Sequence, residues 1–131
     1  MKKLLPSKKI TNARVVKGAG RGKKIGIATI NFNPVCAQGL VEGIYICRVT
    51  LDKPYWGVLH FGPRPVFGEK DQSLEAHLFD FEEGKEPKTA DIEIFSFIRE
   101  IVDFAGVAQM LEAIQKDIEI AKREIKKLEE Q

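Results

Sequence analysis

The chain has 131 residues, of which 44% are hydrophobic and 31% charged, and this balance is typical of a single globular domain. No stretch approaches the length of a transmembrane helix, so we expect a cytoplasmic protein with no membrane partner. The net charge of +2 is unevenly distributed, because the nine Lys and Arg of residues 1–41 precede the first acidic residue, Glu42. A basic N-terminal third suits an anionic ligand, although a solvated tail over residues 2–9 accounts for four of its lysines.

The first hundred residues read as a succession of short strands. Each is rich in β-branched or aromatic residues, and turn residues separate it from the next. We place the strands at residues 13–17, 24–32, 43–51, 55–61, 74–81 and 90–98. Six closely spaced strands without helices between them favour an antiparallel barrel or sandwich over a parallel sheet. We assign the barrel to residues 12–99, after a basic N-terminal segment over residues 1–11.

A glycine cluster stands between the first two strands. Three glycines within residues 18–22 surround Arg21, so the backbone can approach an anion closely while the guanidinium supplies donors. Thr29 and Asn31 follow, and residues two apart on a strand point to the same side. A phosphate-cradling loop before two neutral oxygen ligands suits a nucleotide with its magnesium ion. The spacing matches neither a Walker A loop nor a dinucleotide fingerprint, and a simple turn between strands is the alternative.

The last quarter of the chain changes to a helical period. Apolar residues at alternating intervals of four and three predict a helix over residues 105–129, with the stripe Val107, Leu111, Ile114, Ile118, Ala121, Ile125 and Leu128. The first half of this stripe is expected to pack on the barrel. The distal end, with Ile125 and Leu128, either packs there too or pairs with a second copy as a coiled coil. We therefore expect a monomer, or a weak dimer through the distal helix.

The cysteines and histidines do not form a recognisable metal site. Cys36 and Cys47 have no metal-binding or redox spacing, so we expect reduced thiols. His60 and His77 lie seventeen residues apart without further ligands nearby in the sequence, and we interpret both as structural.

Several motifs, taken in order, resemble riboflavin kinase, the module that in bacteria usually forms the C-terminal half of a bifunctional enzyme that also makes FAD. The resemblance covers nearly the whole chain, from about residue 13 to residue 123. It implies one domain over residues 1–131, a six-stranded antiparallel Greek-key barrel with a long C-terminal helix. The matching segments are residues 18–22, 25–26, 28–31, 43–45, 62–65, 74–81 and 99–100, with Phe104.

The resemblance implies a role for each matching position. Thr29 and Asn31 would bind Mg²⁺ together with phosphate oxygens of ATP. Glu75 would be the general base on the 5′-hydroxyl of riboflavin, and Arg99 and Phe104 would lie near the flavin. The nucleotide-binding residues would be Gly18, Gly20, Arg21, Gly22 and Lys23. Because the resemblance covers the kinase module alone, we expect the chain to make FMN and not FAD.

The residue types agree with this chemistry. Phosphoryl transfer needs positioning and charge neutralisation more than covalent help. Thr29 and Asn31 are both neutral, so we expect magnesium to arrive already bound to ATP. Along the strand at residues 74–81, Glu75 alternates onto one face with His77 and the rings of Phe79 and Phe81, and a carboxylate beside aromatic surface is a candidate for a raised pKa. A surface carboxylate on a polar strand face is the alternative.

Two departures from the family pattern leave a second function open. Ala28 stands where the family has proline, and Val66 where it usually has threonine. A module that binds flavin or nucleotide without turnover is therefore the main alternative to a kinase. Nucleic-acid binding through the basic N-terminal third is a weaker one, because it leaves Glu75 and the Thr29/Asn31 pair without a purpose.

Overall fold

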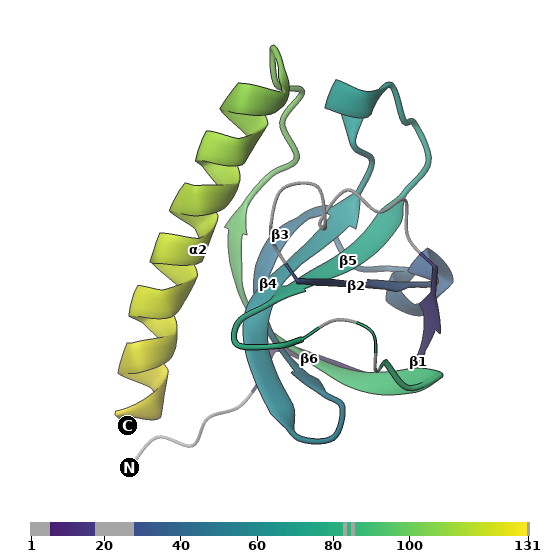
Figure 1. The fold of residues 1–131 in the computed structure, drawn as a ribbon, viewed down its shortest axis with the longest axis vertical. Coiled ribbons are helices and arrows are strands. Elements are labelled where there is room, and N and C mark those ends of the chain that lie inside the picture. Colours follow the sequence, from purple (N-terminus) through teal and green to yellow (C-terminus); the bar gives the residue numbers. More distant parts are fainter. Residues whose placement is uncertain (1–5, 18–27, 83, 85, 131) are drawn as a thin grey trace.

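A computed structural model describes residues 6–17, 28–82, 84 and 86–130, which form six strands and one long helix (Figure 1). The strands are β1 (Lys8–Val16), β2 (Thr29–Phe32), β3 (Gly43–Thr50), β4 (Pro54–Gly62), β5 (Ser73–Leu78) and β6 (Thr89–Arg99). Short 3-10 turns, η1 (Pro34–Ala37) and η2 (Pro65–Phe67), follow β2 and β4, and the helix is α2 (Val107–Glu129). The predicted six-stranded antiparallel barrel with a C-terminal helix is confirmed.

The strands close into a barrel in the order β1-β2-β5-β4-β3-β6, and every hydrogen-bonded pair is antiparallel. Strands β3, β4 and β5 follow one another directly, whereas β6 returns to lie beside β3. This arrangement is a Greek key. It also places β2 against β5, and so brings the strand that follows the glycine cluster beside the strand that carries Glu75.

Alternate side chains fill the inside of the barrel with one apolar cluster. Ile30 and Phe32 of β2 meet Leu74 and Ala76 of β5 there, each at most 2% exposed. Because side chains on a strand alternate between faces, the residues between them lie on the outside of the barrel. Among the described residues, apolar side chains therefore fill the interior, and the polar candidates of β2 and β5 lie on the outer surface.

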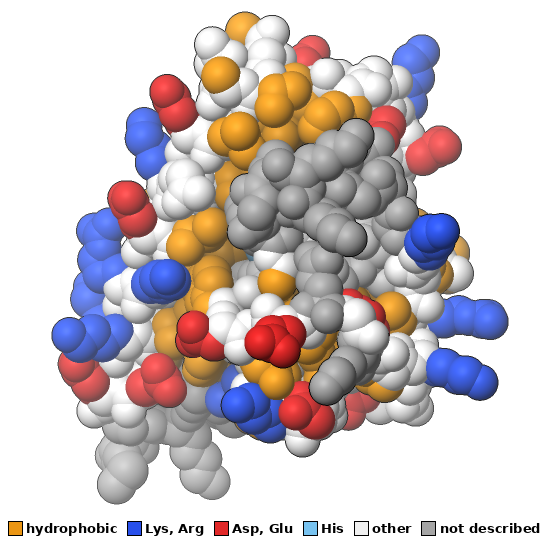
Figure 2. Space-filling view, in the orientation of Figure 1, with side chains coloured by type: hydrophobic (Ala, Val, Ile, Leu, Met, Phe, Trp, Pro, Cys, Tyr) orange, Lys and Arg blue, Asp and Glu red, His pale blue; other side chains and the backbone are white. Residues whose placement is uncertain are grey.

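Helix α2 lies along the outside of the barrel over a second apolar cluster (Figure 1). Ile44 and Ile46 of β3 and Val58 of β4 pack there against Ala121 and Ile125 of the helix. Figure 2 shows hydrophobic side chains along the seam between helix and barrel, and charged side chains on the outer side of the helix. In the part of the chain that the structure describes, no helix is both long and apolar enough to cross a membrane.

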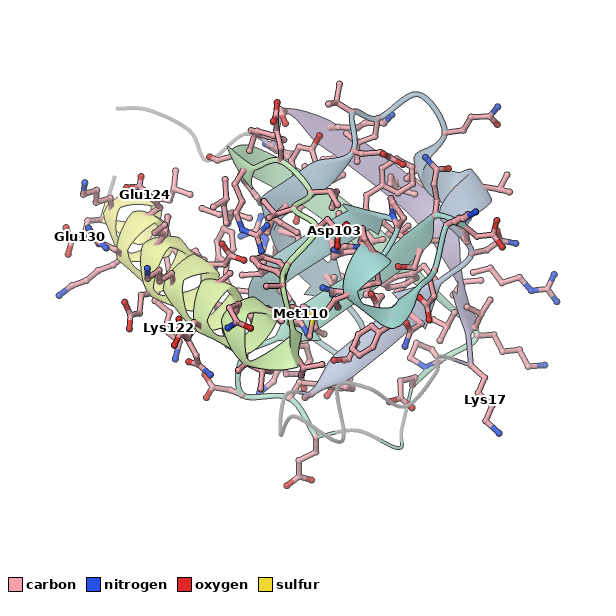
Figure 3. All side chains as sticks on the ribbon, turned by 90° about the horizontal axis from the view of Figure 1, so that it is seen from above. Lys17, Asp103, Met110, Lys122, Glu124 and Glu130 are labelled. Carbon is pink, nitrogen blue, oxygen red and sulfur yellow. The ribbon has the colours of Figure 1, made fainter. Side chains whose placement is uncertain are left out.

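The helix differs from its predicted stripe at the first turn. Val107 is 43% exposed, whereas Met110 is buried and points toward the barrel in Figure 3. At the distal end, Ile125 is only 6% exposed and belongs to the outer cluster. Of the two alternatives for Ile125, the structure therefore favours packing on the barrel.

The first and fifth strands also differ from the prediction. Strand β1 begins at Lys8 and not at residue 13, so part of the expected N-terminal tail pairs with β6. Strand β5 ends at Leu78, because Asp80 takes a left-handed conformation with φ of 60°. The expectation that Phe81 shares a face with Glu75 is therefore wrong: its ring packs against the interior cluster and meets Tyr55 edge-on at 5.1 Å.

Candidate functional site

Strand register brings the predicted ligands and the predicted base together on the outer face of the barrel. In the β2–β5 pair, Thr29 lies opposite His77 and Asn31 lies opposite Glu75. Residues directly opposite in an antiparallel pair point to the same face. Thr29, Asn31 and Glu75 therefore converge on one surface, as the sequence predicted. In the β4–β5 pair, His60 is the partner of Glu75 on the other side.

Two glycines allow this packing. At Gly57 of β4, a Cβ would come within 2.2 Å of the carbonyl oxygen of His77, so any side chain would push β5 away from β4. Gly62 ends β4 with φ of 139°, a conformation that L side chains rarely adopt. The turn at Gly62 directs the following residues back over β5, where Arg64 reaches Glu75.

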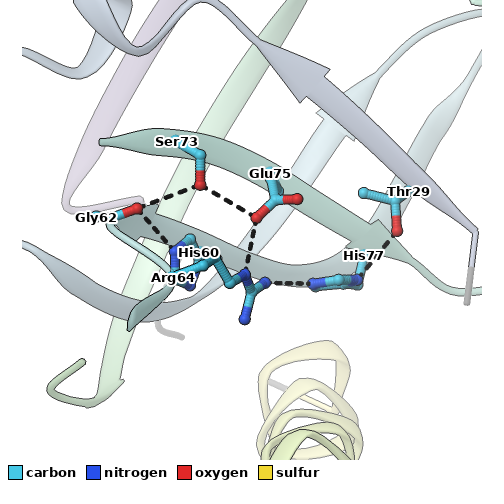
Figure 4. Close-up of polar contacts among 7 residues, drawn as sticks. All are labelled: Thr29, His60, Gly62, Arg64, Ser73, Glu75 and His77. Atoms are coloured by element: carbon cyan, nitrogen blue, oxygen red, sulfur yellow. Dashed lines mark hydrogen bonds and ion pairs between the residues drawn. The ribbon is translucent and has the colours of Figure 1, made fainter. Parts of the chain in front are cut away.

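Polar contacts link these side chains in a chain across the outer face (Figure 4). Arg64 donates from Nε to Oε2 of Glu75 at 3.0 Å and from Nη2 to Nε2 of His77 at 3.3 Å. Nδ1 of His77 lies 3.2 Å from Oγ1 of Thr29. The hydroxyl of Ser73 lies 3.2 Å from both Oε2 of Glu75 and the carbonyl oxygen of Gly62, and its single proton can serve one of them at a time.

The contacts determine the tautomer of His77. An Arg side chain can only donate, so Nε2 of His77 accepts and Nδ1 carries the proton that it donates to Thr29. Burial and the neighbouring guanidinium of Arg64 lower the pKa of His77 to about 4, against the opposing charge of Glu75. The ring is therefore neutral at physiological pH, and it connects the hydroxyl of Thr29 to Arg64.

The expected rise in the pKa of Glu75 is wrong. Burial of the carboxyl opposes ionisation, but the charge of Arg64 and the hydrogen bond that it donates hold the pKa of Glu75 below the usual range. The aromatic surface that motivated the expectation is not the dominant neighbour. The carboxylate is ionised at neutral pH. Arg64 balances its charge and donates a hydrogen bond to one of its two oxygens.

Asn31 and Glu75 line a shallow cavity of about 220 Å³ between the end of β1 and the turn before β5. Lys17 and Ser73 also contribute to its wall. The second carboxylate oxygen, Oε1 of Glu75, accepts no hydrogen bond from any described residue. The cavity thus offers a carboxylate oxygen beside an amide and a lysine. A larger cavity, of about 450 Å³, lies between α2 and residues 53–56, and no predicted site residue lines it.

Arg99 and Phe104 lie together near Arg64. The guanidinium of Arg99 is 5.5 Å from the ring centre of Phe104 and binds Asp117 of α2 through two hydrogen bonds of 2.9 and 2.8 Å. Arg99, Phe104 and Arg64 also surround a small void with His60. The two positions expected near a flavin therefore line a void with Arg64 that is separate from the cavity lined by Asn31 and Glu75.

The remaining predicted site residues, Gly18, Gly20, Arg21, Gly22 and Lys23, lie outside the described residues. Within the part that the structure describes, no group of three or more His, Cys, Asp or Glu could hold a metal ion. Thr29 and Asn31 remain the candidate ligands, because both carry neutral oxygens on the surface that holds Glu75. Magnesium prefers oxygen ligands, so this pair fits a metal shared with a nucleotide.

Sequence reasoning missed Arg64 and His77 as members of the site. The sequence places Arg64 only within the matching segment 62–65, without a role, and His77 is interpreted as structural. Nothing in the local spacing shows that a turn eleven residues before Glu75 folds back onto it. One available signal was the alternation that places Glu75 and His77 on the same strand face, since two buried polar groups side by side need a shared partner.

Comparison with known proteins identifies one family. Residues 5–125 match the family described as "Flavokinase: Riboflavin kinase". The chain is 37% identical over 119 residues to the "Trifunctional protein RibF/MnmA" of Mycoplasmoides gallisepticum, covering 88% of this chain and 18% of that protein. It is 32% identical to the "Bifunctional riboflavin kinase/FMN adenylyltransferase" of Haemophilus influenzae, covering 83% and 36%. It is 30% identical to the "Riboflavin kinase" of Homo sapiens, covering 86% and 77%.

Among solved structures, the chain is similar to one titled "Crystal Structure of Macrolide-efflux Protein from Streptococcus pneumoniae", with a TM-score of 0.68. The match is 24% identical and covers 86% of this chain and 38% of that one. At this identity the likeness shows the fold alone. Against the first bacterial relatives the chain spans well under half of their length, so the activities of those whole proteins do not transfer by similarity.

Proposed function

The chain belongs to the riboflavin kinase family, and we propose that it transfers the γ-phosphate of ATP to the 5′-hydroxyl of riboflavin, giving ADP and FMN. One observation supports the proposal above the others: a buried, ionised carboxylate, Glu75, lies on the same surface as the oxygen ligands Thr29 and Asn31. The match to the riboflavin kinase of Homo sapiens spans 77% of that protein, so this chain corresponds to most of the length of that relative.

In the proposed reaction, Oε1 of Glu75 accepts the proton of the 5′-hydroxyl. The hydroxyl oxygen attacks the γ-phosphorus, the bond from that phosphorus to the β–γ bridging oxygen breaks, and ADP leaves. The proton then returns from Glu75 to water. A positioned general base contributes about 10²- to 10⁴-fold to such a step, and the rest comes from alignment and from neutralising the phosphate charge.

Arg64 has two functions in this scheme. Its Nε holds Oε2 of Glu75, which leaves Oε1 directed to the substrate. Its Nη1 donates to no described residue, so the guanidinium can also face a phosphate, for which its planar fork is well suited. His77 keeps the other side of Arg64 in place, because Nε2 of its neutral ring accepts from Nη2.

Thr29 and Asn31 would hold magnesium together with the phosphates of ATP. The ion would neutralise the charge of the transferring phosphoryl group. Two neutral ligands offset none of the charge of the ion, so the protein would bind the ion as part of the nucleotide complex. The nucleotide phosphates would also contact the backbone of the glycine cluster, at Gly18, Gly20, Arg21, Gly22 and Lys23, and the flavin would lie near Arg99 and Phe104.

A direct assay tests the proposal. Purified protein is incubated with riboflavin and Mg-ATP, and flavins and nucleotides are separated by chromatography. We expect FMN and ADP to appear in equal amounts, and no product when magnesium is chelated. Tight riboflavin binding without FMN would contradict the proposal and favour a binding module that does not turn over.

A further inference from the structure

One nitrogen of His60 lacks the partner that a buried polar atom normally has. The side chain is only 2% exposed, and Nδ1 is the only buried side-chain nitrogen or oxygen among the described residues without a hydrogen bond. An unsatisfied buried acceptor destabilises a fold and is rare in native proteins. The mechanism proposed above gives this atom no function.

The protonation state of His60 follows from its other nitrogen. Nε2 lies 2.9 Å from the carbonyl oxygen of Gly62, which can only accept, so Nε2 carries the hydrogen. Burial and the charge of Arg64 lower the pKa of His60 to about 3, although Glu75 opposes this shift. The imidazole is neutral, and Nδ1 presents a lone pair to its surroundings. What Nδ1 lacks is a donor.

The void beside His60 has the size of one small group. Its volume is about 10 Å³, and its walls include the turn that carries Arg64 and the segment after Arg99, with Phe104 and Met110. Such a volume is close to the minimum that holds one water molecule. A single hydroxyl group would fill it, whereas an aromatic ring would require the two covering segments to separate.

The position of His60 places this acceptor beside the proposed reaction centre. His60 and Glu75 are directly opposite in the β4–β5 pair, so their side chains leave neighbouring strands about 5 Å apart on the same face. The ribityl chain of riboflavin carries hydroxyls on consecutive carbons up to the 5′ position. When the 5′-hydroxyl lies at Glu75, another hydroxyl of the ribityl chain can therefore reach His60 on the neighbouring strand.

We propose that Nδ1 of His60 accepts a hydrogen bond from a ribityl hydroxyl of riboflavin and so selects a substrate with a polyol chain. This inference rests on the proposed function and deepens it. His60 is then a specificity-determining residue that touches the substrate without exchanging a proton with it. Its neutral ring is suited to that task, because a protonated ring would repel Arg64 and offer no lone pair.

Two substitutions test the contributions of the two nitrogens of His60 separately. In His60→Gln the side-chain amide can still donate to the carbonyl of Gly62 from the position of Nε2, but the acceptor at Nδ1 is lost. In His60→Asn the amide oxygen occupies nearly the position of Nδ1, and the contact with Gly62 is lost. Binding is measured by quenching of flavin fluorescence, with riboflavin and with lumiflavin, which carries a methyl group in place of the ribityl chain.

We expect His60→Gln to weaken riboflavin binding about tenfold and to leave lumiflavin binding unchanged, whereas His60→Asn keeps near wild-type affinity for riboflavin. Equal losses for both flavins, or no loss in His60→Gln, would overturn the inference while leaving the kinase proposal intact. A wild-type protein that binds no riboflavin would contradict the kinase proposal itself. Should His60→Gln fail to fold, wild-type protein with 3′- and 4′-deoxyriboflavin provides the second test, because one of these analogues must bind more weakly than riboflavin.

Discussion

At the scale of single residues, the site depends on how Arg64 neutralises Glu75. Both side chains are at least 91% buried, and their contact of 3.0 Å is the shorter of the two side-chain hydrogen bonds that Arg64 makes. Removing one partner of a buried pair leaves an uncompensated charge, which typically destabilises a protein by about 3–5 kcal/mol. Arg64 therefore sets the ionisation of Glu75 as well as the order of the turn.

We predict that Arg64→Gln raises the pKa of Glu75. Without the guanidinium, the effect of burial, which already favours the protonated carboxyl, is no longer outweighed by the charge of Arg64. The acidic limb of the pH profile of kcat is therefore expected to move to higher pH. Arg48→Gln is the matched control, because Arg48 pairs with Glu93 on β3 and β6, away from the site. An unchanged limb in Arg64→Gln would show that Glu75 does not depend on Arg64.

The sequence predicted this site in part. Spacing alone places Thr29 and Asn31 on one face, because the period of a strand is two. That Glu75 joins them depends on the pairing of β2 with β5, which only the family resemblance suggested. The contact between Glu75 and Arg64 could not be predicted from the sequence, because Arg64 reaches the carboxylate through a turn that no periodic pattern describes. The sign of the pKa shift was wrong for the same reason: it depends on which charge lies nearest in space.

At the scale of elements, α2 stabilises the barrel from outside. Ile125 near its C-terminal end is 6% exposed within the outer cluster, and Ile120, five residues earlier, is 39% exposed. The two residues have the same chemistry on opposite sides of one helix. Replacing each of them by alanine therefore separates the contribution of packing to stability from that of helix propensity.

We predict that Ile125→Ala lowers the free energy of unfolding by about 2–4 kcal/mol, because it leaves a cavity against β3 and β4. Ile120→Ala is expected to change it by less than about 0.5 kcal/mol. Urea denaturation followed by circular dichroism measures both. Equal effects would mean that the distal helix does not pack on the barrel in solution, and a concentration-dependent midpoint would point to a helix-mediated dimer.

The architecture was predictable from the sequence for two reasons. Short strands separated by turn residues without helices favour a closed antiparallel sheet, and the change to a helical period marks the last element. The distal half of the helix was ambiguous, because its stripe fits either a barrel surface or a second helix. The early start of β1 was missed because Lys8 and Lys9 point to solvated chain and not to a strand.

At the scale of the whole molecule, the buried imidazoles make stability depend on pH. In the folded protein the pKa of His77 is about 4 and that of His60 about 3, whereas an unfolded histidine titrates near pH 6.5. Between these values the unfolded chain binds more protons than the folded one, so acidification favours unfolding. Glu75, whose pKa is lowered, acts in the same direction at lower pH. Asp117, whose burial raises its pKa, opposes it.

We predict that stability is highest above pH 6.5 and is lost as the pH falls from 6.5 toward 4, at about 1.4 kcal/mol per pH unit for each buried imidazole. Thermal unfolding at a series of pH values measures the slope. His77→Gln removes one titrating group and is expected to make the slope shallower. A melting temperature that stays constant from pH 7 to pH 4.5 would show that the imidazoles are not buried in the neutral form.

The most direct test of the whole account is the turnover of Glu75→Gln. We predict that kcat for FMN formation falls about 10²- to 10⁴-fold while the Kd for Mg-ATP changes little, since the amide keeps the shape of the side chain but accepts no proton at neutral pH. Glu93 is a strand carboxylate that is also paired with an arginine but is less buried, and Glu93→Gln is expected to turn over like the wild type. Wild-type turnover in Glu75→Gln would contradict the account.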